Sequence, residues 1–205
     1  YTVRAYIDGL APDTQYFYRF LGANESRSRI GRTRTAPTPE QARKVNLAFA
    51  SCQNYEQAYY GSWARMLEED QNAAEDDRIH FVLHLGDFIY ERCWDKRLDG
   101  STQARKVPPF PDGVDAPGSR DAVSLADYRH LYKTYLSDPH LQEARARWPF
   151  ICTWDDHEFA DDCFQSFTTH DCQGVLESQR KLGANQSWFE YIPAVFDELQ
   201  QPAHN

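Results

Sequence analysis

Apolar and polar residues alternate over the first 35 positions in a pattern typical of short β-strands. Residues 2–7 and 15–20 are rich in β-favouring side chains, and the second run alternates polar with apolar positions. Pro12 and Asp13 lie between the two runs and favour a turn. We therefore expect strand, turn and strand over residues 1–35. Because a segment this short cannot close a two-layer sandwich, we expect it to be the end of a larger β module.

The pattern changes after residue 35. Residues 36–44 contain two prolines and few large apolar side chains, which is typical of a linker. Beyond the linker, short apolar runs alternate with segments of helical periodicity, which favours an α/β domain over residues 45–205. The expected strands are residues 45–50, 79–85 and 150–154, and the expected helices are residues 58–69, 125–136 and 178–191. Residues 100–118, rich in Pro and Gly, are expected to form a long loop beside the functional site.

The composition narrows the class of protein. Of 205 residues, 41% are hydrophobic and 14% are aromatic, which is enough for a packed core and argues against disorder. The net charge of -9 argues against a nucleic-acid-binding surface. No apolar run reaches the roughly 18 residues of a membrane-spanning helix, and the N-terminus has no signal-peptide pattern. The chain opens on Tyr1 rather than Met, so we expect a processed or excised piece.

The cysteines have no C-x-x-C spacing, which argues against a zinc ribbon. Their number, five, is odd and leaves at least one thiol without a partner in the same chain. Cys163 and Cys172 are near enough in sequence for a local disulfide in an oxidising compartment, and free buried thiols are the alternative. Cys52 follows an expected strand and is the candidate for a special role.

Groups that bind metals or transfer protons follow each expected strand of the α/β domain. They are Cys52 after residues 45–50, Asp87 and Tyr90 after residues 79–85, and Asp156 and His157 after residues 150–154. Because the carboxyl ends of parallel strands meet at one edge of a sheet, we expect these side chains to converge there. Carboxylate, thiolate, phenolate and imidazole bind hard or borderline cations and carry protons. The pattern predicts a metal-dependent hydrolase.

The same motifs resemble those of the calcineurin-like metallophosphoesterases. Gly86-Asp87-x-x-Tyr90 matches a Gly-Asp-x-x-Tyr block of that superfamily. Ser51-Cys52 and Trp154-Asp155-Asp156-His157-Glu158 are similar to the corresponding motifs of its PhoD-like alkaline phosphatases and phosphodiesterases. The resemblance covers roughly residues 45–195. It implies a calcineurin-like β-sheet with flanking helices, incomplete in this chain.

The N-terminal part has a resemblance of its own. Residues 9–18 resemble the E to F corner of fibronectin type III and immunoglobulin-like sandwiches, in which a tyrosine bonds back to the backbone. A module of this kind usually precedes the PhoD-like domain. The resemblance implies the end of such a module at residues 1–35, a linker at 36–44 and the first part of a metallophosphatase domain at 45–205.

Carried over residue by residue, the resemblance implies two metal ions. Cys52 and Tyr90 would bind a ferric ion, and Asp87 would bridge this ion to a second cation. Asp156 would bind the second cation, which in the family is calcium. His157 would be the catalytic histidine beside the phosphoryl group. The implied reaction is hydrolysis of phosphate mono- or diesters by a metal-bound hydroxide, and the implied location is periplasmic or secreted.

Two alternatives stay open, because the superfamily's later His and Gly-His-x-His blocks have no match in this sequence. In the first, the chain is a catalytically inactive phosphatase-like binding module. In the second, it is a truncated product that lacks the later metal ligands. The sequence sets neither the natural substrate nor the oligomeric state.

Other polar residues near the motifs have less specific explanations. Asp155 is expected to orient a ligand or to cap a helix, with direct metal binding as the alternative. Glu91 and Glu158 are expected to orient ligands or to pair with Arg. His84 alternates within a strand and is expected to be a hydrogen-bonded core residue or to support a metal ligand. The histidines expected at the surface are His80, His130 and His140.

Overall fold

A computed structural model describes residues 2–168 and 174–194, which contain both helices and strands. Its central element is a parallel sheet in the order β3-β4-β8. The strands are β3 (Leu47–Ala50), β4 (Phe81–His84) and β8 (Phe150–Cys152). Ala50 pairs with His84 and His84 with Cys152, so the three carboxyl ends lie at one edge. The expected strands of the α/β part are confirmed, each shorter than expected.

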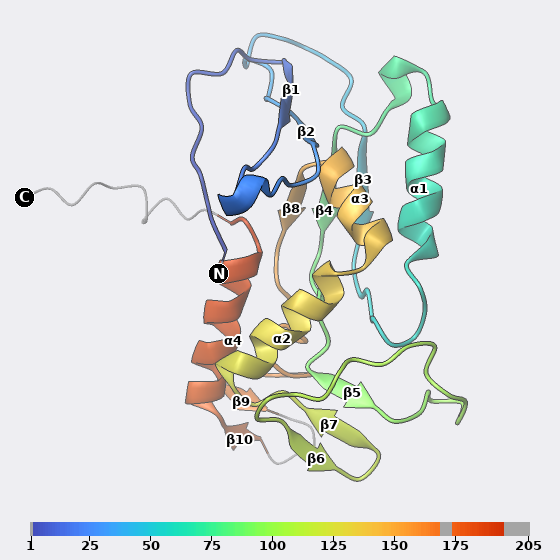
Figure 1. The fold of residues 1–205 in the computed structure, drawn as a ribbon, viewed down its shortest axis with the longest axis vertical. Helices are drawn as coiled ribbons and strands as arrows, with labels where there is room; N and C mark the ends of the chain where they lie inside the picture. Colours follow the sequence, from blue (N-terminus) through green and yellow to red (C-terminus); the bar gives the residue numbers. More distant parts are fainter. Residues whose placement is uncertain (1, 169–173, 195–205) are drawn as a thin grey trace, which may run out of the picture.

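Helices α1 (Gly61–Asn72), α2 (Leu125–Leu136), α3 (Pro139–Arg147) and α4 (Ser178–Tyr191) pack beside this sheet (Figure 1). Helix α2 begins with a capping box: the Ser124 hydroxyl accepts from the Asp127 amide, and the Asp127 carboxylate accepts from the Ser124 amide. Its side chains Tyr128, Tyr132 and Tyr135 are buried in the core. The expected helices at 125–136 and 178–191 are confirmed, and the one expected at 58–69 begins later.

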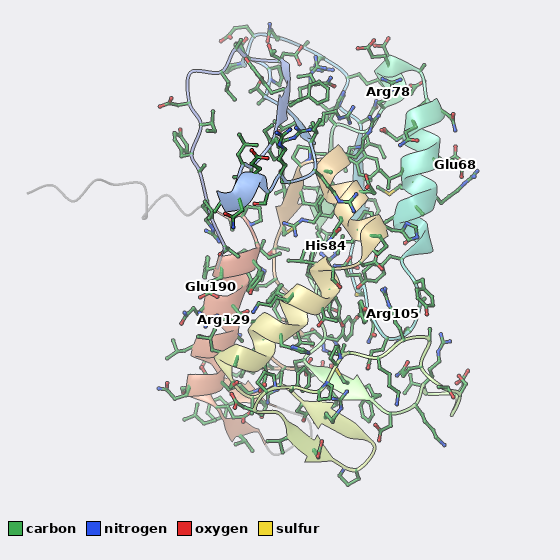
Figure 2. All side chains as sticks on the ribbon, viewed as in Figure 1. Glu68, Arg78, His84, Arg105, Arg129 and Glu190 are labelled. Atoms are coloured by element: carbon green, nitrogen blue, oxygen red, sulfur yellow. The ribbon has the colours of Figure 1, made fainter. Side chains whose placement is uncertain are left out.

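The ion pair between Arg129 of α2 and Glu190 of α4 ties these two helices together, and both side chains are labelled in Figure 2. The Arg129 guanidinium donates two hydrogen bonds to the carboxylate, at 2.7 and 2.5 Å. This bidentate geometry fixes one helix against the other more tightly than a single contact would. No helix of the described residues is long and apolar enough to span a membrane.

The two faces of the parallel sheet differ. On the face that packs against the helices, Val82 and His84 have no exposed surface. On the other face, Leu47, Phe49 and Ile151 are 45%, 72% and 57% exposed. Parallel sheets are usually buried on both faces. The described residues therefore cover only one side of this sheet.

The N-terminal part contains an antiparallel hairpin of β1 (Gln15–Tyr18) and β2 (Gly31–Arg34), with the short 3₁₀ helix η1 (Ala23–Glu25) between its strands. The Ala11 amide donates to the Tyr16 hydroxyl at 2.9 Å, as expected for a tyrosine corner. The expected strand at residues 2–7 is wrong: these residues are exposed and belong to no strand. Strand-favouring residues form a strand only where a neighbouring strand pairs with them.

A small antiparallel sheet of order β5-β7-β6 follows the central strands, built from β5 (Arg92–Trp94), β6 (Val114–Ala116) and β7 (Ser119–Asp121). The loop expected at 100–118 therefore ends in a hairpin strand, because β6 lies within it. Two-residue strands β9 (Phe167–Thr168) and β10 (Val175–Leu176) pair near α4, and the short 3₁₀ helix η2 (Glu75–Asp77) precedes β4.

The segment between β5 and β6 is anchored to the loop before α1. Arg105 stacks on the Tyr55 ring at 3.6 Å and forms an ion pair with Asp138 at 2.5 Å. The buried carboxylate of Glu56 accepts from the amides of Trp94 and Val107, both at 3.1 Å. Although it has little regular structure, the middle of this segment is therefore fixed.

Candidate metal centre

The loops that leave β3 and β4 are joined by backbone hydrogen bonds. The Cys52 amide donates to the Gly86 oxygen at 3.3 Å, and the Gln53 amide donates to the Asp87 oxygen at 3.1 Å. Cys52 and Asp87 both have left-handed backbone conformations, with φ of 56° and 54°. Such a conformation is uncommon for residues with a side chain and turns the chain sharply at the end of each strand. The two side chains therefore meet beyond the sheet edge.

Gly86 lets the loop after β4 approach the loop after β8. Its φ is 102°, and a Cβ atom at this position would lie 2.4 Å from Asp155 Cβ and 2.6 Å from the Asp155 amide nitrogen. Backbone atoms cannot shift away as the tip of a flexible side chain can. The position therefore requires glycine for two reasons, conformation and space.

Asp87 is the centre of a cluster with Cys52 and Tyr90. The Cys52 thiol donates to Asp87 Oδ2 at 3.2 Å, and the Tyr90 hydroxyl donates to the same oxygen at 3.3 Å. Asp87 is only 5% exposed, and its Oδ1 has no hydrogen-bond partner among the described residues. Burial raises the pKa of Asp87, although the Cys52 hydrogen bond and the His157 charge act against this.

These three side chains fit a bound cation. A buried carboxylate with an unpartnered oxygen needs positive charge or donors nearby, and a cation would supply that charge. Thiolate and phenolate groups suit a transition-metal ion such as ferric iron, and a carboxylate can bridge two ions. Burial, followed by the charge of Asp87, raises the pKa of the Tyr90 hydroxyl, and a cation would act in the opposite direction.

Asp156 and His157 approach the same cluster from the loop after β8. Ligand atoms of Asp87, Asp156 and His157 all lie within 4.8 Å of one another. The Tyr90 and His157 rings are 4.1 Å apart between centroids. The structure thus brings together all of the residues predicted for the site. Their roles as ligands or catalyst stay predictions.

Glu91 orients His157. The buried Glu91 carboxylate lies 2.8 Å from His157 Nδ1 and accepts from the Asp161 amide at 2.9 Å. Burial alone would lower the pKa of His157, but the hydrogen bond to Glu91 and the charges of Glu91, Asp87 and Asp156 raise it to about 9. Glu91 was expected to orient a metal ligand or to pair with Arg; it contacts His157, and its role in orienting a ligand stays a prediction.

Glu158 joins two of the loops. Its carboxylate accepts hydrogen bonds from the amides of Asp87, Phe88 and Asp155, at 3.0, 2.5 and 2.7 Å. Glu158 therefore binds backbone amides rather than the Arg expected as one alternative. Burial raises its pKa to about 7, although the three amides act against this. Two of its partners, the amides of Asp87 and Phe88, lie in the loop after β4, 71 and 70 residues away, so sequence spacing could not identify them.

Asp155 caps no helix and belongs to no cluster of metal-binding atoms among the described residues. Its backbone amide, rather than its carboxylate, takes part in the loop geometry by donating to Glu158. The expected role in capping a helix is wrong. A possible disulfide between Cys163 and Cys172 lies outside the described residues.

The other histidines differ in part from expectation. His84 is buried, as expected, but neither of its ring nitrogens has a hydrogen-bond partner among the described residues, so a hydrogen-bonded role is wrong. His80 is half-buried, and its Nδ1 accepts from the Asn46 amide at 3.0 Å. His130 is also half-buried, beside Pro108, and His140 is exposed as expected.

Comparison with known proteins gives consistent matches along the chain. The family model of the PhoD-like phosphatases matches residues 47–204, and the model of the PhoD-like phosphatase N-terminal domain matches residues 1–37. The sequence is 31% identical over 200 residues to alkaline phosphatase D of Bacillus subtilis (strain 168), covering 97% of this chain and 31% of that protein.

The fold is similar to a solved structure described as "Structure of PhoD". The TM-score is 0.74 and the sequence identity 32%, over 95% of this chain and 34% of that chain. The chain described here spans about a third of the length of the relatives that it matches.

Proposed function

Because this chain belongs to the PhoD-like phosphatase family, we propose that it supplies metal-binding loops of a phosphoric ester hydrolase. One observation carries the proposal: thiol, phenol, carboxylate and imidazole groups from three separate loops converge at one edge of the parallel sheet. The substrate class is a phosphate mono- or diester. The activity is proposed for the protein at the length of its relatives.

The proposed ligand roles follow from the chemistry of the donors. Cys52 and Tyr90 would hold a ferric ion, with Asp87 shared between this ion and a second one. Asp156 would hold the second ion, for which oxygen ligands favour calcium. The unpartnered Oδ1 of buried Asp87 supports a cation at this position. When bound, the cations supply Lewis acidity that draws charge from the phosphoryl oxygens and lowers the pKa of a bound water.

His157 would be the residue that transfers a proton during hydrolysis. Its Nδ1 faces the buried carboxylate of Glu91, which keeps the imidazole in one orientation and favours its protonated form. Nε2 lies 3.6 Å from Asp161 Oδ1 and is the nitrogen available to a substrate. From there it would donate a proton to the leaving-group oxygen or stabilise charge on the phosphoryl group. Glu158 would fix the position of the Asp87 loop relative to the Asp155 loop.

The test measures cleavage of 4-nitrophenyl phosphate and bis(4-nitrophenyl) phosphate by protein of verified iron and calcium content. Asp87→Asn should lose bound metal together with activity. His157→Gln should keep its metal and lower kcat by about 10²- to 10⁴-fold, the usual contribution of a general acid. The matched control is His140→Gln, because His140 is exposed on α3 away from the site. It should change neither quantity.

Two outcomes would contradict the proposal. The first is metal-loaded wild-type protein that cleaves neither ester. If such protein still bound phosphate, the inactive binding module would be the better account. The second is an Asp87→Asn variant with undiminished metal content, which would remove Asp87 from the proposed bridge.

A further inference from the structure

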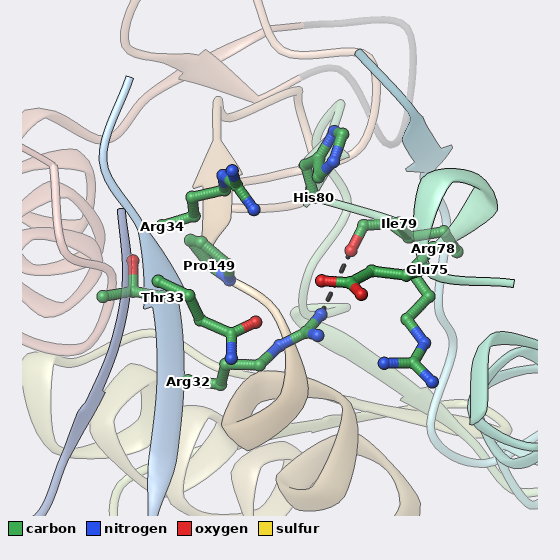
Figure 3. Close-up of a pocket in the computed structure, with 9 residues that line it drawn as sticks. Arg32, Thr33, Arg34, Glu75, Arg78, Ile79, His80 and Pro149 are labelled. Atoms are coloured by element: carbon green, nitrogen blue, oxygen red, sulfur yellow. Dashed lines mark hydrogen bonds between the residues drawn. The ribbon is translucent and has the colours of Figure 1, made fainter. Parts of the chain in front are cut away.

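A cavity of about 130 Å³ lies at the opposite edge of the parallel sheet from the metal centre (Figure 3). It forms where β2 of the N-terminal hairpin meets the segments that lead into β4 and β8. We call it the seam cavity; its lining includes the ionisable residues Arg32, Arg34, Glu75, Arg78 and His80. None of the lining residues belongs to the loops of the metal centre.

Arg32 is held in the cavity by neutral groups. Its Nε donates to the Arg147 backbone oxygen at 2.9 Å, and its Nη2 donates to the Ile79 backbone oxygen at 3.1 Å. No ion pair of Arg32 with a carboxylate occurs within residues 2–168 and 174–194. The two carbonyl bonds fix the plane of the guanidinium, which forms no ion pair with a carboxylate among these residues.

Arg78 is the second guanidinium without a compensating carboxylate in the described part of the chain. Its Nε is buried and has no hydrogen-bond partner there. A buried donor without an acceptor destabilises the fold unless another group or a ligand supplies the acceptor. Figure 3 shows the guanidinium groups of Arg32 and Arg78 directed toward the same space.

Two nearby carboxylates already form ion pairs with other arginine side chains. Asp13 accepts from Arg34 at 2.9 Å and also forms an ion pair with Arg43. Asp70 is fully buried and accepts from Arg147 at 2.6 Å. Both carboxylates are therefore already paired with other guanidinium groups, although the charge of Asp70 also acts on Arg32.

Glu75 is the remaining acid in the lining, and it is exposed. The cavity thus presents Arg32 and Arg78 against a single carboxylate that bulk water also screens. Burial, and then the charge of neighbouring Arg43, lowers the pKa of His80, so the imidazole contributes a neutral polar group. Burial, and then the charge of Arg147, lowers the pKa of Arg32, although the charge of Asp70 acts against this.

We propose that the seam cavity binds a small tetrahedral oxyanion of the phosphate or sulfate class, held between Arg32 and Arg78. Guanidinium groups bind such oxyanions through paired, charge-assisted hydrogen bonds. The cavity volume of about 130 Å³ is enough for a five-atom oxyanion. Since Arg32 belongs to the hairpin and Arg78 to the α/β part, the anion would join the two parts. This proposal does not depend on the proposed phosphatase activity.

Glu75 separates this proposal from a purely structural role of the arginines. If the cavity receives an anion, the Glu75 carboxylate competes with it, and removing that charge strengthens binding. If the arginines serve only to join the hairpin to the α/β part, then removing Glu75 leaves the affinity for added anions unchanged.

The experiment titrates inorganic phosphate, and separately sulfate, into the full chain by calorimetry, with sodium chloride at matched ionic strength as the reference. Both oxyanions should bind and raise Tm beyond the effect of chloride. Arg78→Gln should weaken binding by about tenfold, the usual effect of losing one charge-assisted contact. Glu75→Gln should strengthen it severalfold. The matched control Arg65→Gln removes a charge from the exposed face of α1 and should leave binding unchanged.

Asp87→Asn distinguishes the two ends of the molecule, since phosphate bound at the metal centre would depend on Asp87. Phosphate binding at the seam cavity, and the increase in Tm that it causes, should persist in this variant. The proposal is overturned if chloride raises Tm as much as phosphate does, or if Arg65→Gln and Arg78→Gln weaken binding equally. It is also overturned if Asp87→Asn abolishes all phosphate binding, or if Glu75→Gln leaves the phosphate affinity unchanged.

Discussion

The two edges of the parallel sheet carry opposite chemistry and are assembled in different ways. At the carboxyl edge, thiol, phenol, carboxylate and imidazole come from loops that directly follow the strands. At the amino edge, Arg32 comes from the hairpin and Arg78 from the segment before β4. The first site depends on the local geometry of turns, and the second depends on the hairpin lying against the α/β part. A substitution that disrupts the site at one edge should therefore leave binding at the other edge unchanged.

The strongest test of the carboxyl edge is Gly86→Ala. The new Cβ would contact the Asp155 backbone at 2.6 Å and strain a φ of 102°, so we expect a loss of more than about 4 kcal/mol in the free energy of unfolding. Metal content should fall with it. Urea denaturation and elemental analysis measure the two effects. Gly100→Ala is the matched control, because φ there is 79° but nothing lies within 4 Å, and it should cost about 1 kcal/mol. Equal losses would show that the close approach is unimportant.

Glu158→Ala tests the junction of the two loops without changing any predicted metal ligand. Three backbone amides would lose their acceptor, and we expect a loss of about 3 kcal/mol in the free energy of unfolding together with weaker metal binding. Phosphate affinity at the seam cavity should not change. Exposed Glu68, replaced by Ala, is the control, and its effect should be within about 0.5 kcal/mol. A change in seam affinity for Glu158→Ala would argue against independent edges.

His84 lies in the middle strand of the parallel sheet, between the two edges, and its protonation should change the stability of the fold. Burial lowers its pKa from 6.5 to about 4, so between these values the unfolded chain binds a proton that the folded chain does not. Folded stability contributed by neutral His84 is therefore complete above pH 6.5 and is lost as pH falls toward 4. The expected loss is up to about 3 kcal/mol. Denaturation of wild type and of His84→Leu across this range measures it, and parallel pH profiles would contradict it.

Arg32→Gln has the smallest expected effect on stability. The variant loses bonds to two carbonyls but also relieves repulsion among neighbouring guanidinium groups, so we expect a change of about 1 kcal/mol. Amide hydrogen exchange should accelerate in β1 and β2 and stay unchanged in β3, β4 and β8. Metal content should also be unchanged. Faster exchange throughout the parallel sheet would mean that the hairpin supports the metal centre as well.

Features encoded locally were predictable from sequence. Helical periodicity predicted α2 and α4, and the apolar runs predicted the three parallel strands and hence the convergence of Cys52, Asp87 and His157. Residues 2–7 were mistaken for a strand because composition cannot show whether a partner strand is present. The hairpin of β6 and β7 was missed because three-residue strands are too short to show a periodicity.

Features that depend on contact between distant residues were not predictable. The role of Glu158 depends in part on the amides of Asp87 and Phe88, 71 and 70 residues earlier, and the need for glycine at position 86 depends on the approach of Asp155. The seam cavity likewise joins Arg32 to Arg78, which share no motif. Each of these depends on tertiary packing, and the spacing of residues along the chain does not reveal such contacts.

The anchoring of Arg105 has a consequence for proteolysis. The segment between β5 and β6 has the composition of an easily cut loop, yet the amides of Ala104 and Arg105 donate to the Glu56 oxygen and the Arg105 side chain is only 10% exposed. A protease must draw several residues out into an extended form before it cleaves. Trypsin should therefore cut first at the exposed turn that contains Lys96 and Arg97. Cleavage at Arg105 should follow only after that segment detaches from Tyr55 and Asp138.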